Sequence, residues 1–282
     1  TAQGPRILQF TVTPNPVNLG NQRVGGTSSG ALTIANVAPG GSFSEGLDAG
    51  FGTLTGSVLS NGGTVSLLAA GASNNSAMTL RLDGSTAGAK TGTAQINFAS
   101  NGNGTSGLGI TNLASQTVTV NGSFFNAAAG QLNTAALNFG TVQVGQSVSQ
   151  VLSITNSATG AAGFVEDLNA RFGATSGTGS NLISGSGSIA NLLAGGTNSS
   201  AMTVNVNTAA AGSVNGAIAV NYFSAGAVNS VSNGLGELGV GSSSFGVAGT
   251  TQANGFGVRY QVEPHLPADV LGCYIIAPVV SS

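Results

Sequence analysis

Thr33-Ile34-Ala35-Asn36 and Ser153-Ile154-Thr155-Asn156 decide the fold, because they are one short strand pattern written twice, 120 residues apart. The chain's only two methionines, Met78 and Met202, recur in the same way within matching Ser-Ala-Met-Thr stretches. A repeat of about 120 residues is longer than the 20–50-residue unit of a solenoid. We interpret it as a duplicated domain, whose copies span roughly residues 8–126 and 132–250.

Within each copy the apolar residues alternate with polar ones, as Leu32 and Ile34 do around Thr33. Strict alternation places one set of side chains on a core face and the other toward solvent. Asn-Gly dipeptides, which favour the positive φ angles of tight hairpins, separate these runs at residues 61, 101, 215, 233 and 254. The pattern predicts an all-β chain of two tandem antiparallel β-sandwiches with extended terminal strands, which the family resemblance described below implies to be immunoglobulin-like.

The same matches set the expected boundaries. We expect an N-terminal strand segment at 1–14, a first sandwich at 15–126, a linker at 127–131, a second sandwich at 132–250 and a C-terminal extension at 251–282.

The composition excludes several classes of function. Of 282 residues, 46 are glycine and only 5% are charged, against about 25% in an ordinary soluble domain. Six basic residues cannot form the stripe that binds nucleic acid. The single cysteine, Cys273, cannot form an intrachain disulfide or a thiolate metal cage. We expect no cofactor, no bound metal and, since no apolar run reaches 18 residues, no membrane span.

The first copy also carries longer motifs. They include Val17-Asn18-Leu19-Gly20, the stretch Gly104-Thr105-Ser106-Gly107-Leu108-Gly109 and, after it, Ser115-Gln116-Thr117-Val118-Thr119-Val120. With these motifs the chain resembles the choice-of-anchor D repeats of bacterial exported proteins, which are similar to immunoglobulin-like ASPM/SPD-2/Hydin domains. The resemblance covers most of the first copy and the front two-thirds of the second, which departs from the pattern at Ser224–Ser244. It implies a β-sandwich and an exported location, and it implies no enzymatic activity.

Three motifs that could suggest catalysis or nucleotide binding are interpreted as structural. The G-x-G-x-x-G stretches at 102–107 and 234–239 lack the following helix that would present amides to a phosphate, so we expect loops. The G-x-S-x-G match at 26–30 lacks a nearby histidine base. Glu263, His265, Asp269 and Cys273 form the densest titratable cluster, but its Pro-flanked stretch favours a structural tail over a Cys–His nucleophile.

Each copy carries a pair of carboxylates near a phenylalanine at an equivalent position. Glu45 with Asp48, and Glu166 with Asp167, could bind Ca²⁺, but that ion prefers six to eight oxygen ligands. We therefore expect these carboxylates to accept hydrogen bonds from backbone N–H groups of their own loops.

The two ends carry alternating strands outside the repeat, at Arg6–Val12 and Phe256–Val262, with a further apolar stretch at Cys273–Val280. Such strands can complete the sheet of a neighbouring subunit, or they can pack in their own chain; the sequence leaves both open. The candidate intersubunit residues are Leu8, Phe10, Val12, Val258, Tyr260, Val262, Tyr274 and Ile276.

Together these features predict a non-enzymatic extracellular structural protein, a self-assembling subunit of a bacterial surface fibre or matrix whose partners are copies of itself. The alternative is a monomeric surface adhesin or glycan-binding module, although three tyrosines and no tryptophan provide few of the aromatic side chains that sugar sites use. The start at Thr1 rather than Met fits a secreted chain whose signal peptide has been removed.

Overall fold

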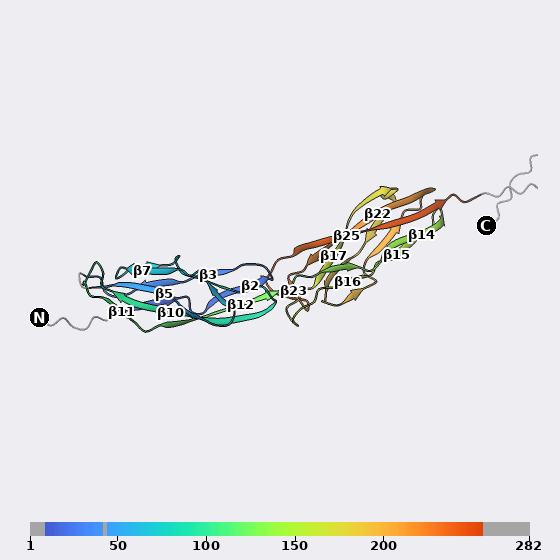
Figure 1. Cartoon of the computed structure of the whole chain (residues 1–282). Helices are drawn as coiled ribbons and strands as arrows, with labels where there is room; N and C mark the ends of the chain where they lie inside the picture. Colours follow the sequence, from blue (N-terminus) through green and yellow to red (C-terminus); the bar gives the residue numbers. More distant parts are fainter. Residues whose placement is uncertain (1–8, 42–43, 256–282) are drawn as a thin grey trace, which may run out of the picture.

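The computed structural model describes residues 9–41 and 44–255. These residues form two β-sandwiches placed end to end, so that the chain enters at the outer end of the first and leaves at the outer end of the second (Figure 1). The predicted fold class, an all-β chain of two tandem sandwiches, is confirmed. Each sandwich also contains one parallel strand pair that the sequence pattern did not indicate.

The first sandwich packs a large sheet against two smaller three-stranded sheets. The large sheet has the order β2 (Val17–Arg23), β12 (Gln116–Phe125), β10 (Gly88–Asn101), β5 (Gly46–Leu54) and β7 (Thr64–Leu68), with β11 (Ile110–Asn112) also paired to β10. The smaller sheets are β1 (Phe10–Thr13), β4 (Thr33–Asn36) and β8 (Ser73–Asn74), and β3 (Ser29–Ala31), β9 (Thr79–Leu82) and β6 (Val58–Ser60).

The second sandwich repeats this arrangement. Its large sheet has the order β14 (Ala136–Gln143), β25 (Leu238–Gln252), β22 (Gly212–Ser224), β17 (Leu168–Thr178) and β19 (Ser188–Leu192). The smaller sheets are β13 (Gly130–Leu132), β16 (Ile154–Asn156) and β20 (Thr197–Asn198), and β15 (Val148–Val151), β21 (Thr203–Val206) and β18 (Ile183–Ser186). A 3₁₀ turn, Ser180–Leu182, precedes β18, and a short hairpin of β23 (Ala227–Val228) and β24 (Val231–Ser232) follows β22.

Each sandwich has its own hydrophobic core, built from the alternating residues of the repeat. Ile34 and Ile154 are fully buried at equivalent positions, and so are Met78 and, to within 1%, Met202. Burying one such side chain contributes about 1.5–3 kcal/mol relative to leaving it exposed. The residues that reveal the duplication in the sequence are therefore those that hold each sandwich together.

The first strands of the two sandwiches are equivalent but differ in packing. β1 pairs antiparallel with β4, and Phe10 stacks on Phe98 with ring centroids 4.1 Å apart. β13 pairs with β16 in the same register, but Gly130 stands where Phe10 would be. A Cβ at Gly130 would lie 2.2 Å from the Tyr222 ring, so only glycine fits against that ring.

The segment expected as a linker, residues 127–131, is instead part of the second sandwich. Ala128 is 4% exposed in the second core, its N–H donates to Ser224 Oγ at 2.8 Å, and Gly130 begins β13. The small residues here fit a short linker, but a glycine at position 130 is also what allows the backbone to approach Tyr222 closely.

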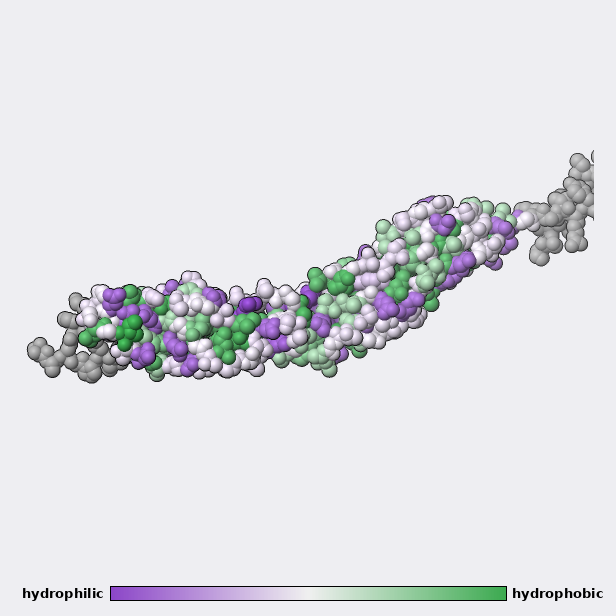
Figure 2. Space-filling model, viewed as in Figure 1, coloured by the Kyte–Doolittle hydropathy of each residue, from purple (hydrophilic) through white to green (hydrophobic). Residues whose placement is uncertain are grey.

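The surface is mostly of intermediate hydropathy, with scattered hydrophilic and hydrophobic patches (Figure 2). Over the described ranges, no helix is long and apolar enough to cross a membrane.

Candidate functional site: the joint between the sandwiches

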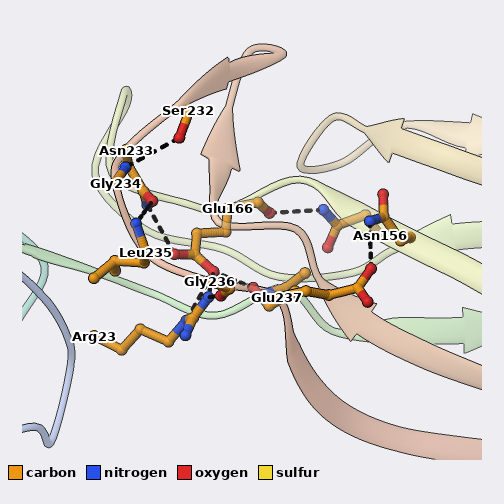
Figure 3. A network of polar contacts seen from close by, with 12 residues as sticks. Arg23, Asn156, Glu166, Ser232, Asn233, Gly234, Leu235, Gly236 and Glu237 are labelled. Atoms are coloured by element: carbon orange, nitrogen blue, oxygen red, sulfur yellow. Dashed lines mark hydrogen bonds and ion pairs between the residues drawn. The ribbon is translucent and has the colours of Figure 1, made fainter.

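The main polar cluster of the described chain lies where the two sandwiches meet, and Arg23 connects one sandwich to the other within it. Arg23 is the last residue of β2 in the first sandwich, and its guanidinium reaches into the second (Figure 3). Its Nε donates to Glu166 Oε2 at 2.9 Å, and its Nη2 lies 2.8 Å from the same oxygen. The Glu166 side chain is fully buried, whereas Arg23 is 19% exposed. A buried carboxylate is costly unless it is paired, so this ion pair ties one sandwich to the other.

Two further donors, both from the second sandwich, complete the coordination of Glu166. Asn233 Nδ2 donates to Oε1 at 2.8 Å, and Ser224 Oγ donates to Oε2. The first sandwich adds two contacts to the same loop, because Arg23 Nη2 donates to Gly236 O and Asn21 Nδ2 donates to Asn233 O, each at 2.6 Å. Several charge-assisted bonds thus converge on one buried group.

The backbone crosses the joint without a free connecting segment. Asn126 N donates to Phe164 O at 2.8 Å, and Glu166 N donates to Asn126 O at 2.9 Å, forming a parallel bridge between Asn126 and Val165. The Phe125 and Phe164 rings pack with centroids 5.4 Å apart. Main-chain pairing, ring packing and a buried ion pair together fix the relative placement of the two sandwiches.

The loop that receives Arg23, residues 225–237, is itself anchored. The Asp167 carboxylate accepts from Ser230 N at 2.6 Å and Asn229 N at 3.2 Å, two residues with positive φ. At the other side Arg171 makes a two-pronged ion pair with Glu237, at 2.6 and 3.0 Å. Hydrogen bonds from Arg171, and then from Asn169, lower the pKa of Glu237.

We call the cluster of Glu166, Ser224, Asn233, Leu235 and Gly236 the inner pole. An equivalent cluster, the outer pole, lies at the outer end of the first sandwich and consists of Glu45, Ser100, Ser106, Leu108 and Gly109. Glu45 accepts from Ser106 Oγ at 2.6 Å and from Ser100 Oγ, as Glu166 accepts from Asn233 and Ser224. Glu45 is 8% exposed.

The two loops match in detail. Leu108 N donates to Ser106 Oγ at 3.2 Å, and Leu235 N donates to Asn233 Oδ1 at 3.0 Å. Gly107 and Gly234, the residues between, both have positive φ. Ser106–Gly109 is therefore the counterpart of Asn233–Gly236. Sequence reasoning missed this match, because it falls in the stretch Ser224–Ser244, where the second copy departs from the pattern.

The prediction for the paired carboxylates is confirmed in part. Asp48 accepts from Leu67 N of β7 at 2.7 Å, and Asp167 accepts from Ser230 N of the 225–237 loop. Both carboxylates thus accept hydrogen bonds from backbone N–H groups, but from segments other than their own loops. Glu45 and Glu166 instead accept from side-chain hydroxyl, amide and guanidinium groups. Only the structure shows that Glu166 accepts a hydrogen bond from a residue of the other sandwich, Arg23.

The first glycine-rich motif, residues 102–107, is a loop between β10 and β11, as predicted. The second is a loop over residues 234–237, but its last two residues, Leu238 and Gly239, begin β25. The G-x-S-x-G match at 26–30 covers the end of the β2–β3 connection and the first two residues of β3, and Ser28 Oγ donates to Leu19 O at 3.3 Å. The titratable cluster of Glu263, His265, Asp269 and Cys273 lies outside the described residues.

The structure describes two of the candidate intersubunit residues. Phe10 and Val12 lie in β1, which pairs with β4 of the same chain, and Val12 is 8% exposed in the first core. This end therefore follows the alternative in which the strand packs in its own chain. The other candidates, namely Leu8, Val258, Tyr260, Val262, Tyr274 and Ile276, lie outside the described residues.

Two hollows are open on the surface of the described part of the chain. One hollow of about 500 Å³ lies over Ser188–Leu193 and Gly196–Asn198, and a second of about 210 Å³ lies between Gly25–Ser28 and Arg81–Ser85. Neither is lined by an aromatic ring. Across residues 9–41 and 44–255 no three His, Cys, Asp or Glu side chains are grouped as metal ligands would be.

No family model and no curated protein sequence matches the chain. Among solved structures it is similar to a Porphyromonas gingivalis protein of unknown function, at 12% identity over 86% of this chain and 99% of that one, with a TM-score of 0.32. It is similar to PapD-like domain 7 of human CEP192, at 9% identity over 45% of this chain and 92% of that domain, with a TM-score of 0.30. It is also similar to the titin domains Z1Z2 in complex with telethonin, at 12% identity over 89% and 100%, with a TM-score of 0.25.

Proposed function

We propose that this chain is a non-enzymatic structural protein, a stiff two-domain rod that serves as a self-assembling subunit of a bacterial surface fibre or matrix. The observation that carries the proposal is the buried Glu166 at the joint, which accepts from Arg23 of the other sandwich. A binding module on a flexible tether has no need of such a joint. A load-bearing spacer does, because its length and direction depend on it.

The surface supports the same function. With a formal net charge of −2 over 282 residues, the subunit lacks the charge repulsion that keeps ordinary proteins apart. In a dissolved monomer this composition favours association. In a subunit that packs beside its own copies outside the cell, it lowers the electrostatic cost of assembly.

The finer parts of the proposal come from the sequence. The motifs that resemble choice-of-anchor D repeats support a bacterial, exported location. We propose that the C-terminal strand around Val258, Tyr260 and Val262, with Tyr274 and Ile276, links subunits by completing a neighbour's sheet. Main-chain hydrogen bonds provide the affinity in such a contact, and alternate side chains provide the specificity.

Negative-stain microscopy of the concentrated full chain tests this proposal. We expect unbranched filaments, and a chain shortened to residues 1–255 is expected to lose them while it keeps its thermal unfolding transition. A full chain that stays monomeric at every concentration would contradict self-assembly. Filaments that persist without residues 256–282 would contradict strand exchange through the C-terminal strand, but not self-assembly.

A further inference from the structure

We infer that a groove on the second sandwich, between β19 and β20, is where the C-terminal segment of a second copy binds. Residues Cys273–Val280 of that copy would lie along the groove and extend a sheet as an added strand. This inference rests on the proposed function, because it names the surface that accepts the donated strand. We call this surface the acceptor groove; its lining is Ser188–Leu193, Gly196–Asn198 and Ala201.

The acceptor groove lies between two open sheet edges. β19 is the last strand of the large sheet, and β20 is the last strand of the small sheet that packs against it. Within residues 9–41 and 44–255, β19 pairs only with β17 and β20 pairs only with β16. The outer side of each strand therefore presents backbone N–H and C=O groups to an extended segment, which is the arrangement that strand addition uses.

The lining of the acceptor groove is neutral and partly built from small residues. No lining residue carries a charge, and Ala190, Gly196 and Ala201 leave room around a hollow of about 500 Å³. Leu193, which follows β19, is 45% exposed. The groove thus offers apolar surface and main-chain partners but no charged group, and these features favour an uncharged, apolar strand.

The sequence beyond the described residues provides one uncharged apolar stretch. Cys273–Val280 has no charged residue, whereas Phe256–Val262 contains Arg259. Pro278 has no backbone N–H to donate, so we place the pairing at Cys273–Ala277, five residues that match the five of β19. Cys273–Val280 is therefore the segment whose chemistry fits the acceptor groove.

The position of the acceptor groove along the rod favours a second copy over the same chain. Leu192 of β19 pairs with Leu168 of β17, which pairs with Ser224 of β22. Ser224 pairs in turn with Leu238, the first residue of β25. The groove therefore lies level with the beginning of β25, whereas the C-terminal segment follows its end, at the outer end of the sandwich (Figure 1).

Binding within one chain would need a long return path. The segment would run back along β25 for about 45 Å and across three strand spacings, or about 15 Å. Residues 256–272, which precede the segment, span at most about 60 Å when fully extended. They would have to be held largely extended, at a cost in conformational entropy that the groove of a neighbouring copy does not impose.

Leu193→Asp tests the acceptor groove by placing a charge in it. The matched control is Val151→Asp, at an exposed apolar side chain on β15, another edge strand of the same sandwich. Sedimentation velocity over a concentration series is expected to show association weakened by roughly tenfold or more for Leu193→Asp, because a charge inside an apolar contact is costly, and little changed for Val151→Asp. Both side chains are exposed, so both variants should keep the thermal unfolding transition of the wild type.

Chemical crosslinking identifies the occupant, because Cys273 is the only cysteine of the chain. A chain with Ala190→Cys and Cys273→Ser has a thiol in the groove and none in the segment, and the wild-type chain has the reverse. A short bis-maleimide is expected to join the two chains in a mixture through Cys273 of the wild type and the groove thiol, as identified by mass spectrometry. A chain with Val151→Cys and Cys273→Ser is the control and is expected to give far less of this product.

The outcomes separate the inference from the proposed function. If the full chain assembles through residues 256–282, but Leu193→Asp behaves as Val151→Asp does and the groove thiol forms no mixed crosslink, the acceptor groove is overturned and the proposed function stands. If Ala190→Cys with Cys273 retained crosslinks only within single chains, the second copy is overturned as the occupant. If the full chain does not self-associate at all, both proposals are overturned.

Discussion

The inner and outer poles are two versions of one structure, and their difference shows how a duplicated sandwich becomes a joint. Both surround a buried glutamate with a serine from the long central strand and a residue from a glycine-rich loop. The inner pole adds the hairpin of β23 and β24 and the Glu237 anchor, and it receives Arg23. At the inner pole this cluster thus forms a contact between the two sandwiches.

The strongest test of the comparison removes Arg23. Arg23→Ala leaves the Glu166 carboxylate buried without its cation, so we expect the free energy of unfolding of the second sandwich to fall by about 3 kcal/mol at pH 7. The matched change at the far end, Gln143→Ala, is expected to cost under about 0.5 kcal/mol. Urea unfolding of both variants measures the difference, and near-equal values would show that the ion pair does not stabilise the joint.

The next test compares the two buried serines. Ser224 donates to Glu166 and also accepts from Ala128 N, while Ser100 donates to Glu45. Ser224→Ala removes partners from a buried carboxylate and a buried amide, so we expect a loss of about 2.5 kcal/mol, against about 1.5 kcal/mol for Ser100→Ala. Urea unfolding measures both losses. A larger loss of unfolding free energy for Ser100→Ala than for Ser224→Ala would contradict the expectation that the serine of the inner pole contributes more stability.

A smaller effect is expected where the first strands differ. Gly130→Ala places a methyl group 2.2 Å from the Tyr222 ring, which the core accommodates only by shifting that ring or β13. We expect a loss of about 1.5 kcal/mol, measured by thermal unfolding. The exposed neighbour provides the control, since Gln131→Ala should be close to neutral; a neutral Gly130→Ala would show that β13 can move away from the ring.

The smallest effect concerns pH and the anchor of the inner pole. The pKa of Glu237 is lowered in the folded chain, so its stabilisation is present above the unfolded pKa, near 4.5, and is lost as the pH falls through the folded value. Because Arg171 and Glu237 are both partly exposed, we expect only about 0.5 kcal/mol between wild type and Glu237→Gln at pH 7, and a smaller difference at pH 3. An equal difference at both pH values would assign it to a cause other than the ion pair.

Much of the fold could be predicted from the sequence, because apolar alternation and a fixed offset directly record which residues face a core. The alternation around Ile34 and around Ile154 predicts the two sandwiches in this way. The sequence pattern does not predict the parallel pairing of β2 with β12 and of β14 with β25. The alternation in an edge strand is the same whether the strand pairs parallel or antiparallel. The small residues at 127–131 were also ambiguous, because they suit a flexible linker and a close backbone approach equally well.

The joint could not be predicted for a different reason. Arg23 and Glu166 are 143 positions apart, and neither lies in a sequence motif that predicts which residue it contacts. The equivalence of Glu45 and Glu166 was visible in the sequence, but the donors to these carboxylates lie on loops of unequal length. Repeat analysis that allowed a shift at Ser106 and Asn233 would have matched the loops, although not the arginine that enters one of them.

The central claim, that a buried Arg23–Glu166 pair fixes two sandwiches into one rod, is tested most directly by a distance distribution across the joint. Spin labels at Gln116→Cys and Val151→Cys, with Cys273→Ser, place one exposed probe on each sandwich for double electron–electron resonance. We predict one narrow distribution in this labelled chain and a clearly broader one when Arg23→Ala is added. A distribution that is already as broad with Arg23 in place would contradict the claim.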